Sequence, residues 1–252
     1  MDLLLKGKRA IVTGGSRGIG KVIARQLAQE GVDVVISARN KERLVATAAE
    51  LSAETGRRII PVVADTGNKQ AVDALVAATV AELGGIDILV NNAAVPGGIS
   101  AATKLEEIID QEVLDDLDIK VVGYLRTARA VAPHLVAKGW GRIINIGGLA
   151  IHRTGRPVAT LRNVGVAAIT KNLADELGPK GVNVVAVHPG ATRTERTDPN
   201  NERDLAVHSS IGRIVDSSEV AWVVAFLASP RSVAINGDAI AVGGGSRGSI
   251  YY

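Results

Sequence analysis

Near its start the chain carries a glycine-rich turn that reads TGGSRGIG from Thr13 to Gly20. An aliphatic run at 10–12 precedes the turn, and a helical pattern follows it to about Glu30. Glycines let a pyrophosphate approach the backbone, and the start of the helix offers free N–H groups and the positive end of its dipole. The flanking strand and helix are the context that makes the motif specific, so we predict a dinucleotide-binding turn rather than a tight turn without a ligand.

The rest of the chain alternates short aliphatic runs with longer helical patterns. Further strands are expected at about 33–37, 59–64, 87–90, 142–146, 182–187 and 239–242, and helices at about 41–55, 70–83, 158–177 and, as one helix or two, 105–137. Such alternation predicts parallel strands joined by helical crossovers. We therefore predict an α/β fold, a Rossmann-type doubly wound parallel sheet of about seven strands, in a single domain over residues 1–252. The polar segment 193–204 reads as irregular, either a lid or a plain surface loop.

Composition and charge exclude several classes of protein. Hydrophobic residues make up 46% of the chain and aromatic residues 2%, which indicates a globular protein with an aliphatic core. The net charge is +3 without a basic block, so no nucleic-acid partner is expected. Cysteine is absent and the four histidines lack metal-ligand spacing, so we expect no metal site. No bilayer-spanning run or secretory signal is evident, and we expect a cytoplasmic protein without a membrane partner.

The residues near the glycine-rich turn indicate which dinucleotide binds. Chains that bind NAD usually carry an acidic residue at the end of the second strand, and here that region reads SARN over 37–40. Arg39 and Arg17 offer guanidinium groups that match a 2′-phosphate. The sequence therefore favours NADP(H), with NAD(H) as the alternative.

In the order of its motifs, the chain resembles the short-chain dehydrogenase/reductase family over about residues 6–245. The turn at 13–20 resembles the family's TGxxxGxG, the segment 91–94 its NNAG, and the segment 189–194 its PGxxxT, which borders the nicotinamide. The resemblance implies a seven-stranded sheet, a small-molecule substrate and a homo-oligomer, tetramer or dimer. The predicted cofactor-binding residues are Gly14, Ser16, Arg17, Gly18, Ile19, Gly20, Arg39, Asp65, Thr66, Asn91, Ala93, Pro189, Gly190 and Thr194.

The same resemblance implies that the usual catalytic residues are missing. Family members use a Tyr acid/base, a Lys four residues later, a Ser after the fifth strand and an Asn in the preceding helix. In this chain the corresponding positions are expected to be Leu161, Gly165, the pair Gly147-Gly148 and Lys120. Ordinary alcohol dehydrogenase activity is therefore expected to be absent.

The three tyrosines offer no evident replacement. Tyr124 is expected to pack in the interior. Tyr251 and Tyr252 either form a frayed end or reach the cleft of a neighbouring subunit.

Three other residues are candidates for the missing chemistry. Lys120 either restores the positive charge lost at Gly165, with a pKa lowered by burial, or reaches outward on an exposed helix face. His152 is either an acid/base near the mouth of the cleft or a plain loop residue. Arg162 either binds an anionic substrate group or is a surface or interface charge.

These observations favour an NADP(H)-dependent oxidoreductase with a non-standard active site. Its substrate is an unidentified carbonyl or alcohol, or an activated C=C bond, because hydride transfer is the chemistry of the cofactor. Two other classes stay open at this point. One is a catalytically inactive NADP(H)-binding protein that acts as a sensor or partner subunit, and the other is a non-redox lyase or isomerase.

Overall fold

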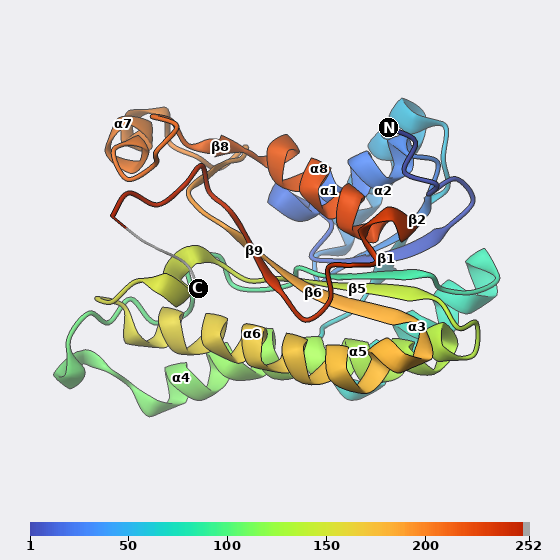
Figure 1. Cartoon of the computed structure of the whole chain (residues 1–252), viewed down its shortest axis with the longest axis horizontal. Helices are drawn as coiled ribbons and strands as arrows, with labels where there is room; N and C mark the ends of the chain where they lie inside the picture. Colours follow the sequence, from blue (N-terminus) through green and yellow to red (C-terminus); the bar gives the residue numbers. More distant parts are fainter. Residues whose placement is uncertain (249–252) are drawn as a thin grey trace.

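Seven parallel strands form one sheet at the centre of the computed structural model, which describes residues 1–248 (Figure 1). The strand order is β3-β2-β1-β4-β5-β6-β9. Because the order reverses at β1, the sheet is doubly wound, and the predicted Rossmann-type fold is confirmed. The strands are β1 (Arg9–Thr13), β2 (Asp33–Ala38), β3 (Ile59–Val63), β4 (Ile88–Asn91), β5 (Gly141–Ile146), β6 (Val182–Pro189) and β9 (Ala239–Val242).

Helices cover both faces of the sheet (Figure 1). One face carries α1 (Gly18–Gln29), α2 (Lys41–Thr55) and α8 (Ser217–Ala228). The other carries α3 (Lys69–Leu83), α5 (Gly123–Val136) and α6 (Pro157–Leu177), with α4 (Asp110–Leu117) packed against α6. No helix within residues 1–248 is both long and apolar enough to cross a membrane.

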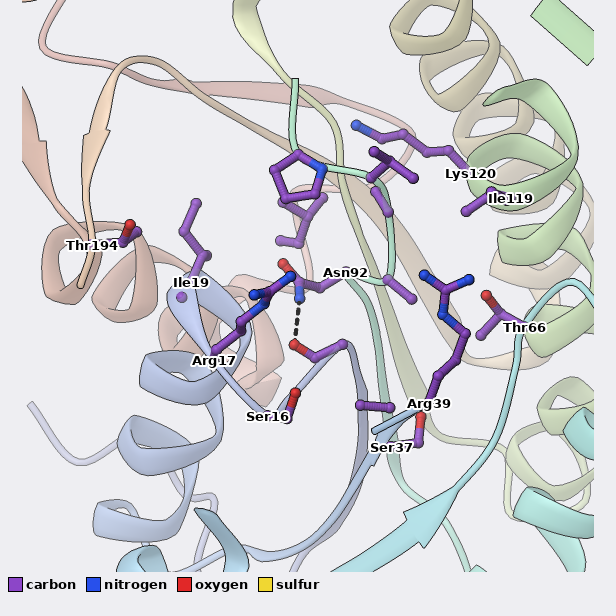
Figure 2. A pocket seen from close by; sticks show the side chains of 18 of the residues that line it. Ser16, Arg17, Ile19, Ser37, Arg39, Thr66, Asn92, Ile119, Lys120 and Thr194 are labelled. Atoms are coloured by element: carbon purple, nitrogen blue, oxygen red, sulfur yellow. Dashed lines mark hydrogen bonds between the residues drawn. The ribbon is translucent and has the colours of Figure 1, made fainter. Parts of the chain in front are cut away.

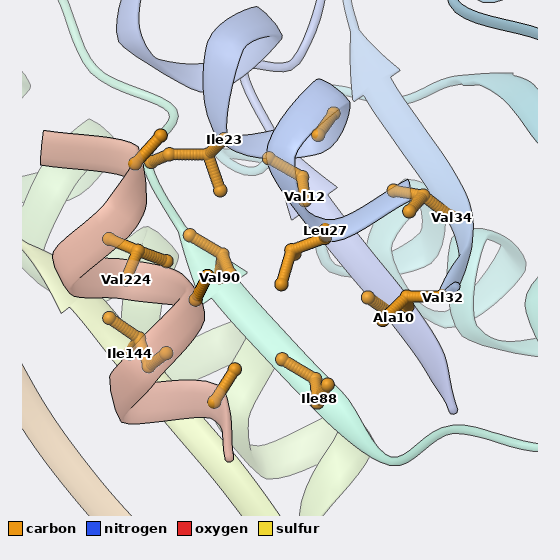
Figure 3. Packing of buried hydrophobic residues seen from close by; sticks show 14 of the residues in the cluster. Ala10, Val12, Ile23, Leu27, Val32, Val34, Ile88, Val90, Ile144 and Val224 are labelled. Atoms are coloured by element: carbon orange, nitrogen blue, oxygen red, sulfur yellow. The ribbon is translucent and has the colours of Figure 1, made fainter. Parts of the chain in front are cut away.

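The aliphatic core lies in two layers, one on each face of the sheet. Alternate residues along a strand contribute to opposite layers, so that Val12 packs towards α1 and α8 while Ile11 packs towards the α3 and α5 side. Figure 3 shows Val12, Ile23 and Val224 meeting in the first of these layers. A sheet buried on both faces is a rigid platform, and it fixes the loops at the carboxyl ends of its strands.

The segment 105–137 differs from the expected one or two regular helices. It contains a 3₁₀ turn, η1 (Leu105–Glu107), then α4, a π-helical turn η2 (Asp118–Val122) and α5. Lys120 lies in the π-helical turn. Such turns widen a helix locally and change the direction in which a side chain points, and they are frequent at functional sites.

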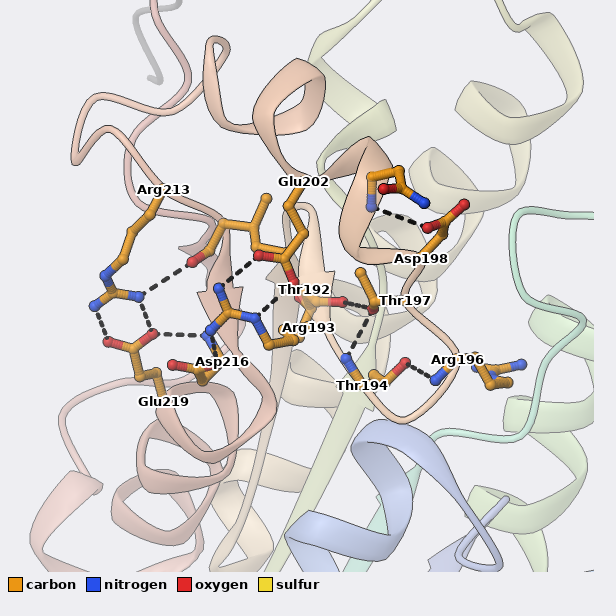
Figure 4. A network of polar contacts seen from close by, with 12 residues as sticks. Thr192, Arg193, Thr194, Arg196, Thr197, Asp198, Glu202, Arg213, Asp216 and Glu219 are labelled. Carbon is orange, nitrogen blue, oxygen red and sulfur yellow. Dashed lines mark hydrogen bonds and ion pairs between the residues drawn. The ribbon is translucent and has the colours of Figure 1, made fainter.

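The segment 193–204 is more regular than its sequence indicates. The short strand β7 (Thr192–Arg193) pairs with β8 (Val215–Asp216), and η5 (Pro199–Asn201) leads into α7 (Glu202–Ala206). The Arg193 guanidinium forms ion pairs with Glu202 and Asp216, as Figure 4 shows. These contacts hold the segment against the start of α8, which corrects the expectation of an irregular loop.

Candidate active site

A cleft of about 800 Å³ lies at the carboxyl ends of the parallel strands. In a doubly wound sheet this edge is where ligands bind, beside the point where the strand order reverses. Most of the predicted site residues line it, namely Gly14, Ser16, Arg17, Gly18, Ile19, Arg39, Asp65, Thr66, Ala93, Lys120, Arg162, Pro189, Gly190 and Thr194.

The glycine-rich turn leaves no room for side chains at Gly14, Gly15 and Gly20. Gly14 has a φ of +65°, in the left-handed region that favours glycine. A Cβ atom on Gly20 would overlap the amide of Asn92 and the carbonyl oxygen of Gly14. That Asn92 amide donates to the carbonyl oxygens of Thr13 (3.1 Å) and Gly14 (3.2 Å). Gly20 therefore packs the turn tightly from behind, outside the residues that line the cleft.

An anionic group occupies the start of α1. The backbone N–H of Gly18 donates to both carboxylate oxygens of Glu195, at 2.9 and 3.2 Å. Free N–H groups and the helix dipole make this position attractive to anions, and it is where the sequence predicts the pyrophosphate. Glu195 was not among the predicted site residues, because its position on the loop after β7 becomes visible only in the fold.

Three arginines line the cleft near the end of β2. Figure 2 shows that Arg17 and Arg39 extend towards the same open space, and Arg43 from the first turn of α2 also lines it. Asn40 begins α2 by accepting a hydrogen bond from the backbone N–H of Arg43 (2.8 Å). Arg43 was missed at the sequence level, since its helical position alone does not indicate that it faces the cleft.

Lys120 lies deep in the opposite part of the cleft and is 4% exposed (Figure 2). Its Nζ donates to the carbonyl oxygen of Gly147 (3.0 Å) and to Oδ1 of Asn163 (2.9 Å). Burial, and secondly the nearby positive charge of Arg162, lower the pKa of the amino group to about 7, against the opposing effect of Asp116. The structure thus excludes an outward-pointing Lys120.

Arg162 is also buried, beside Lys120. Its Nη1 donates to Oδ1 of Asp116 (2.9 Å) and to the carbonyl oxygen of Val95 (3.1 Å). Its Nε has no hydrogen-bond partner within residues 1–248. The ion pair with Asp116 fixes the guanidinium, and because both side chains are buried, Arg162 is not a surface charge.

Besides Gly20, two further predicted residues, Asn91 and His152, lie outside the cleft, which corrects their assignment. Asn91 is fully buried, where its Oδ1 accepts from Thr127 (2.6 Å) and its Nδ2 donates to Asn145 (2.9 Å). It joins β4 to β5 and α5, and Asn92 is the one that lines the cleft. His152 is exposed at the end of the 3₁₀ turn η3 (Leu149–His152) and does not line the cleft.

The imidazole of His188 fills the space beside the two glycines after β5. Its Nδ1 accepts from the backbone N–H of Gly148 (2.9 Å), and the side chain is 1% exposed. Burial lowers the pKa of His188 to about 4, so the ring is neutral at neutral pH. A Cβ atom on Gly147 would overlap this ring. A serine at Gly147 is therefore incompatible with His188 in this position.

The sequence placed the family's Tyr and Lys positions on Leu161 and Gly165 of α6, which is two residues too far along the chain. Leu161 is 49% exposed, and a Cβ atom on Gly165 would contact Val121 at 2.9 Å rather than Lys120. Among the buried pairs of α6 with the same four-residue spacing, Ala159 and Asn163 are the pair whose second residue is hydrogen-bonded to Lys120. Leu161 and Gly165 therefore do not mark the site, and Val121 fills the space beside Gly165.

Tyr124 is buried, as expected, and its hydroxyl donates to the carbonyl oxygen of Ile146 (3.0 Å). Burial raises the pKa of this hydroxyl. Tyr251 and Tyr252 lie outside the described residues.

The sheet, the glycine-rich turn and the cleft define a Rossmann-type α/β protein with a nucleotide-sized site at the carboxyl edge of its sheet. Comparison with known proteins is more specific, because residues 8–205 match the short chain dehydrogenase family. The chain belongs to this family of oxidoreductases.

Its relatives are similar over nearly their whole length. The short-chain reductase protein NovJ of Streptomyces niveus is 37% identical, over 94% of this chain and 92% of its own. The 3-oxoacyl-(acyl-carrier-protein) reductase FabG of Vibrio cholerae is 35% identical, over 96% of this chain and 98% of its own.

Solved structures are also similar to this chain over nearly its whole length. L-sorbose reductase from Gluconobacter frateurii, complexed with NADPH and L-sorbose, has a TM-score of 0.91 at 28% identity, over 99% of this chain and 100% of its own. A short chain dehydrogenase from Burkholderia cenocepacia in complex with NADP has a TM-score of 0.86 at 34% identity, over 96% and 98% of the two chains.

Proposed function

We propose that this chain is an NADP(H)-dependent oxidoreductase in which the amino group of Lys120 is the acid/base. The observation that carries the proposal is the position of that group. It is buried deep in the cleft, held by Gly147 and Asn163, while Arg17, Arg39 and Arg43 line the cleft near the end of β2. One cleft thus contains cations for phosphates and, separately, a group that can transfer a proton.

The residues of the cleft fit NADP(H). The Glu195 carboxylate on the N–H of Gly18 stands in for a phosphate oxygen and marks an anion position at the start of α1. Arg17, Arg39 and Arg43 would bind the 2′-phosphate, which NAD(H) lacks. The NADP(H) complexes of the similar L-sorbose reductase and Burkholderia protein support the same cofactor. When bound, this cofactor supplies or accepts the hydride.

Two of the family's four residue types at the reactive end, Lys and Asn, are present here with their places exchanged. The family resemblance implies an Asn on the earlier helix and a Lys on the later one. This chain has Lys120 before α5 and Asn163 on α6, and the two side chains are hydrogen-bonded (2.9 Å). An amino group therefore still lies between these two segments, although it comes from the segment before α5 and not from α6. Four residues before Asn163 stands Ala159, so α6 supplies no phenol at this position, and within residues 1–248 the one tyrosine, Tyr124, is bonded to the carbonyl oxygen of Ile146.

The amino group has the properties that this role requires. A protonated lysine has three donors, and Gly147 and Asn163 accept two of them. No third acceptor is found within residues 1–248, so the third donor can meet a substrate oxygen or transfer its proton to a substrate carbon. With a pKa of about 7, the group is present in both protonation states near neutral pH, which is optimal for general acid or base catalysis.

The proposal is tested by following NADPH absorbance with a panel of aldehydes, ketones and activated alkenes. We expect turnover of at least one of them, and a loss of about 100-fold or more in kcat in Lys120→Met with unchanged NADPH affinity. Lys171→Met, which removes an exposed lysine of α6, is the matched control. Full turnover by Lys120→Met would contradict the assignment. NADPH binding without turnover of any substrate would favour the catalytically inactive alternative.

A further inference from the structure

A second pocket, of about 370 Å³, adjoins the cleft. Pro189 and Gly190, at the carboxyl end of β6, line both cavities, so that the two meet there. The other walls come from Ala191 and from residues within 149–160, 205–214 and 243–246. A substrate that reaches Lys120 in the cleft can therefore extend into this pocket.

The walls of the second pocket combine apolar and cationic side chains. Leu149 and Ile214 are buried residues that form an apolar part, together with Leu205. Arg153, Arg156 and His208 line the same pocket, and within residues 1–248 no Asp or Glu lines it. The pocket thus suits a molecule with an apolar body and a negative charge.

Arg153 and Arg156 have no carboxylate partner within residues 1–248, whereas Arg162 forms an ion pair with Asp116. Nη2 of Arg153 donates to the hydroxyl of Ser246 (3.3 Å), and Nη2 of Arg156 donates to the carbonyl oxygens of Gly97 (3.1 Å) and Ser100 (3.3 Å). These acceptors are uncharged, and neither arginine forms an ion pair within residues 1–248. Both guanidinium groups are therefore positively charged, and no carboxylate among the described residues that line the pocket compensates this charge.

The start of α6 adds to the positive potential. Arg156 is the N-cap of this 21-residue helix, has no side-chain capping bond, and is followed by Pro157. Thr160 donates to the carbonyl oxygens of Arg153 (2.9 Å) and Ala150 (3.1 Å), which fixes the loop to the helix. The positive end of the helix dipole and both arginines thus lie on the same side of the pocket.

We propose that the substrate carries an anionic group, a carboxylate or a phosphate, which Arg153 and Arg156 bind in this second pocket. The proposal rests on the proposed function and deepens it. The apolar part of the substrate packs on Leu149 and Ile214, and its reacting group extends past Gly190 towards Lys120.

Calorimetric titration of the NADP⁺-saturated chain tests the anion pocket without requiring turnover. The probes are 4-phenylbutyrate, its neutral amide 4-phenylbutyramide, and phenyl phosphate. We expect the carboxylate or the phosphate to bind about tenfold or more tightly than the amide, because charge-assisted hydrogen bonds form only with the anions. Whichever anion binds more tightly identifies the source of the charge.

Variants assign the preference to the pocket. In Arg153→Gln/Arg156→Gln the anions should bind no better than the amide, with NADPH affinity unchanged. Arg153→Lys/Arg156→Lys should recover part of the preference. Arg129→Gln removes an exposed arginine of α5 and should change nothing.

Two results would overturn the anion pocket: equal binding of anion and amide by the wild-type chain, or an anion preference that survives in the double Gln variant. If the folded chain binds no NADPH but still prefers the anion, the proposed cofactor fails while the anion pocket stands.

Discussion

Gly147 and His188 occupy adjoining space, and a Cβ atom on Gly147 would overlap Nδ1 and Cε1 of the imidazole. The ring is held there by the N–H of Gly148 and is almost fully buried. The histidine at the end of β6 thus fills the space that a side chain on the glycine after β5 would need. Any side chain at Gly147 requires the ring to move away from the hydrogen bond that holds it.

This relationship predicts that Gly147→Ser lowers the free energy of unfolding by about 1–3 kcal/mol, the usual cost of overpacking. Urea unfolding measures the loss. Gly148→Ala is the control, because its Cβ would lie 3.4 Å from Oδ1 of Asn163, an ordinary contact. Combining Gly147→Ser with His188→Ala should cost less than the sum of the two single changes, since the overlap is then absent. Strict additivity would contradict the account.

The pH dependence of turnover follows from the lowered pKa of Lys120. In the direction of reduction the amino group must be protonated, so kcat should fall as pH rises through about 7. In the direction of oxidation kcat should rise over the same interval. The groups that face Lys120 are Arg162, Asp116 and His188, and His188 titrates lower, with a pKa of about 4. A flat profile between pH 6 and about 8 would exclude Lys120 as the titrating group.

Stability should report the same pKa independently of activity. Burial lowers the pKa of Lys120 from 10.5 to about 7, so between these values the folded state binds fewer protons than the unfolded state. The free energy of unfolding therefore gains a contribution of about 1.4 kcal/mol per pH unit as pH rises. Lys120→Met should lack this contribution, which urea unfolding at pH 7.5 and about 9.5 measures. Equal slopes in both proteins would show that the amino group has its ordinary pKa when folded.

Glu195 should compete with the cofactor. Its carboxylate accepts from the N–H of Gly18, at the position proposed for a phosphate, so it must leave before NADPH binds. Glu195→Gln removes the negative charge, and we expect NADPH to bind roughly three- to tenfold more tightly, as measured by nucleotide fluorescence. Glu106→Gln changes an exposed carboxylate of η1 and serves as the control. Weaker NADPH binding by Glu195→Gln would mean that the carboxylate assists the cofactor.

Arg39 should determine the preference between the two dinucleotides. Arg39→Gln removes a guanidinium that would pair with the 2′-phosphate, and the Kd for NADPH should rise about tenfold or more. The Kd for NADH should stay the same, because that nucleotide has a hydroxyl at this position. Parallel losses for both nucleotides would indicate that Arg39 supports the fold of the cleft instead.

The sheet could be predicted from the sequence because its strands are buried on both faces and read as continuous aliphatic runs, as at 10–12 and 182–187. The helix α8 was missed, since its sequence is apolar nearly all round and has no amphipathic pattern. A signal was present in Asp216 and Glu219, which have the spacing of a capping box, and the Glu219 carboxylate accepts from the backbone N–H of Asp216.

The candidate site was harder to predict where tertiary contacts decide it. Asn91 and Asn92 are neighbours with the same side chain, so the sequence does not distinguish them. Asn91 faces the interior because it is the last residue of β4. Counting along the chain placed the site on Leu161 and Gly165, whereas the contact with Lys120 selects Asn163. That contact depends on the π-helical turn at 118–122, for which no sequence pattern was available.

Every role proposed for these residues requires that the cleft beside the glycine-rich turn binds NADP(H). Calorimetric titration of the folded chain with NADPH and, separately, NADH tests it directly. We predict saturable binding of one NADPH per chain, with a lower Kd than for NADH. The absence of saturable heat with both nucleotides, on protein whose folding is verified by circular dichroism, would contradict it.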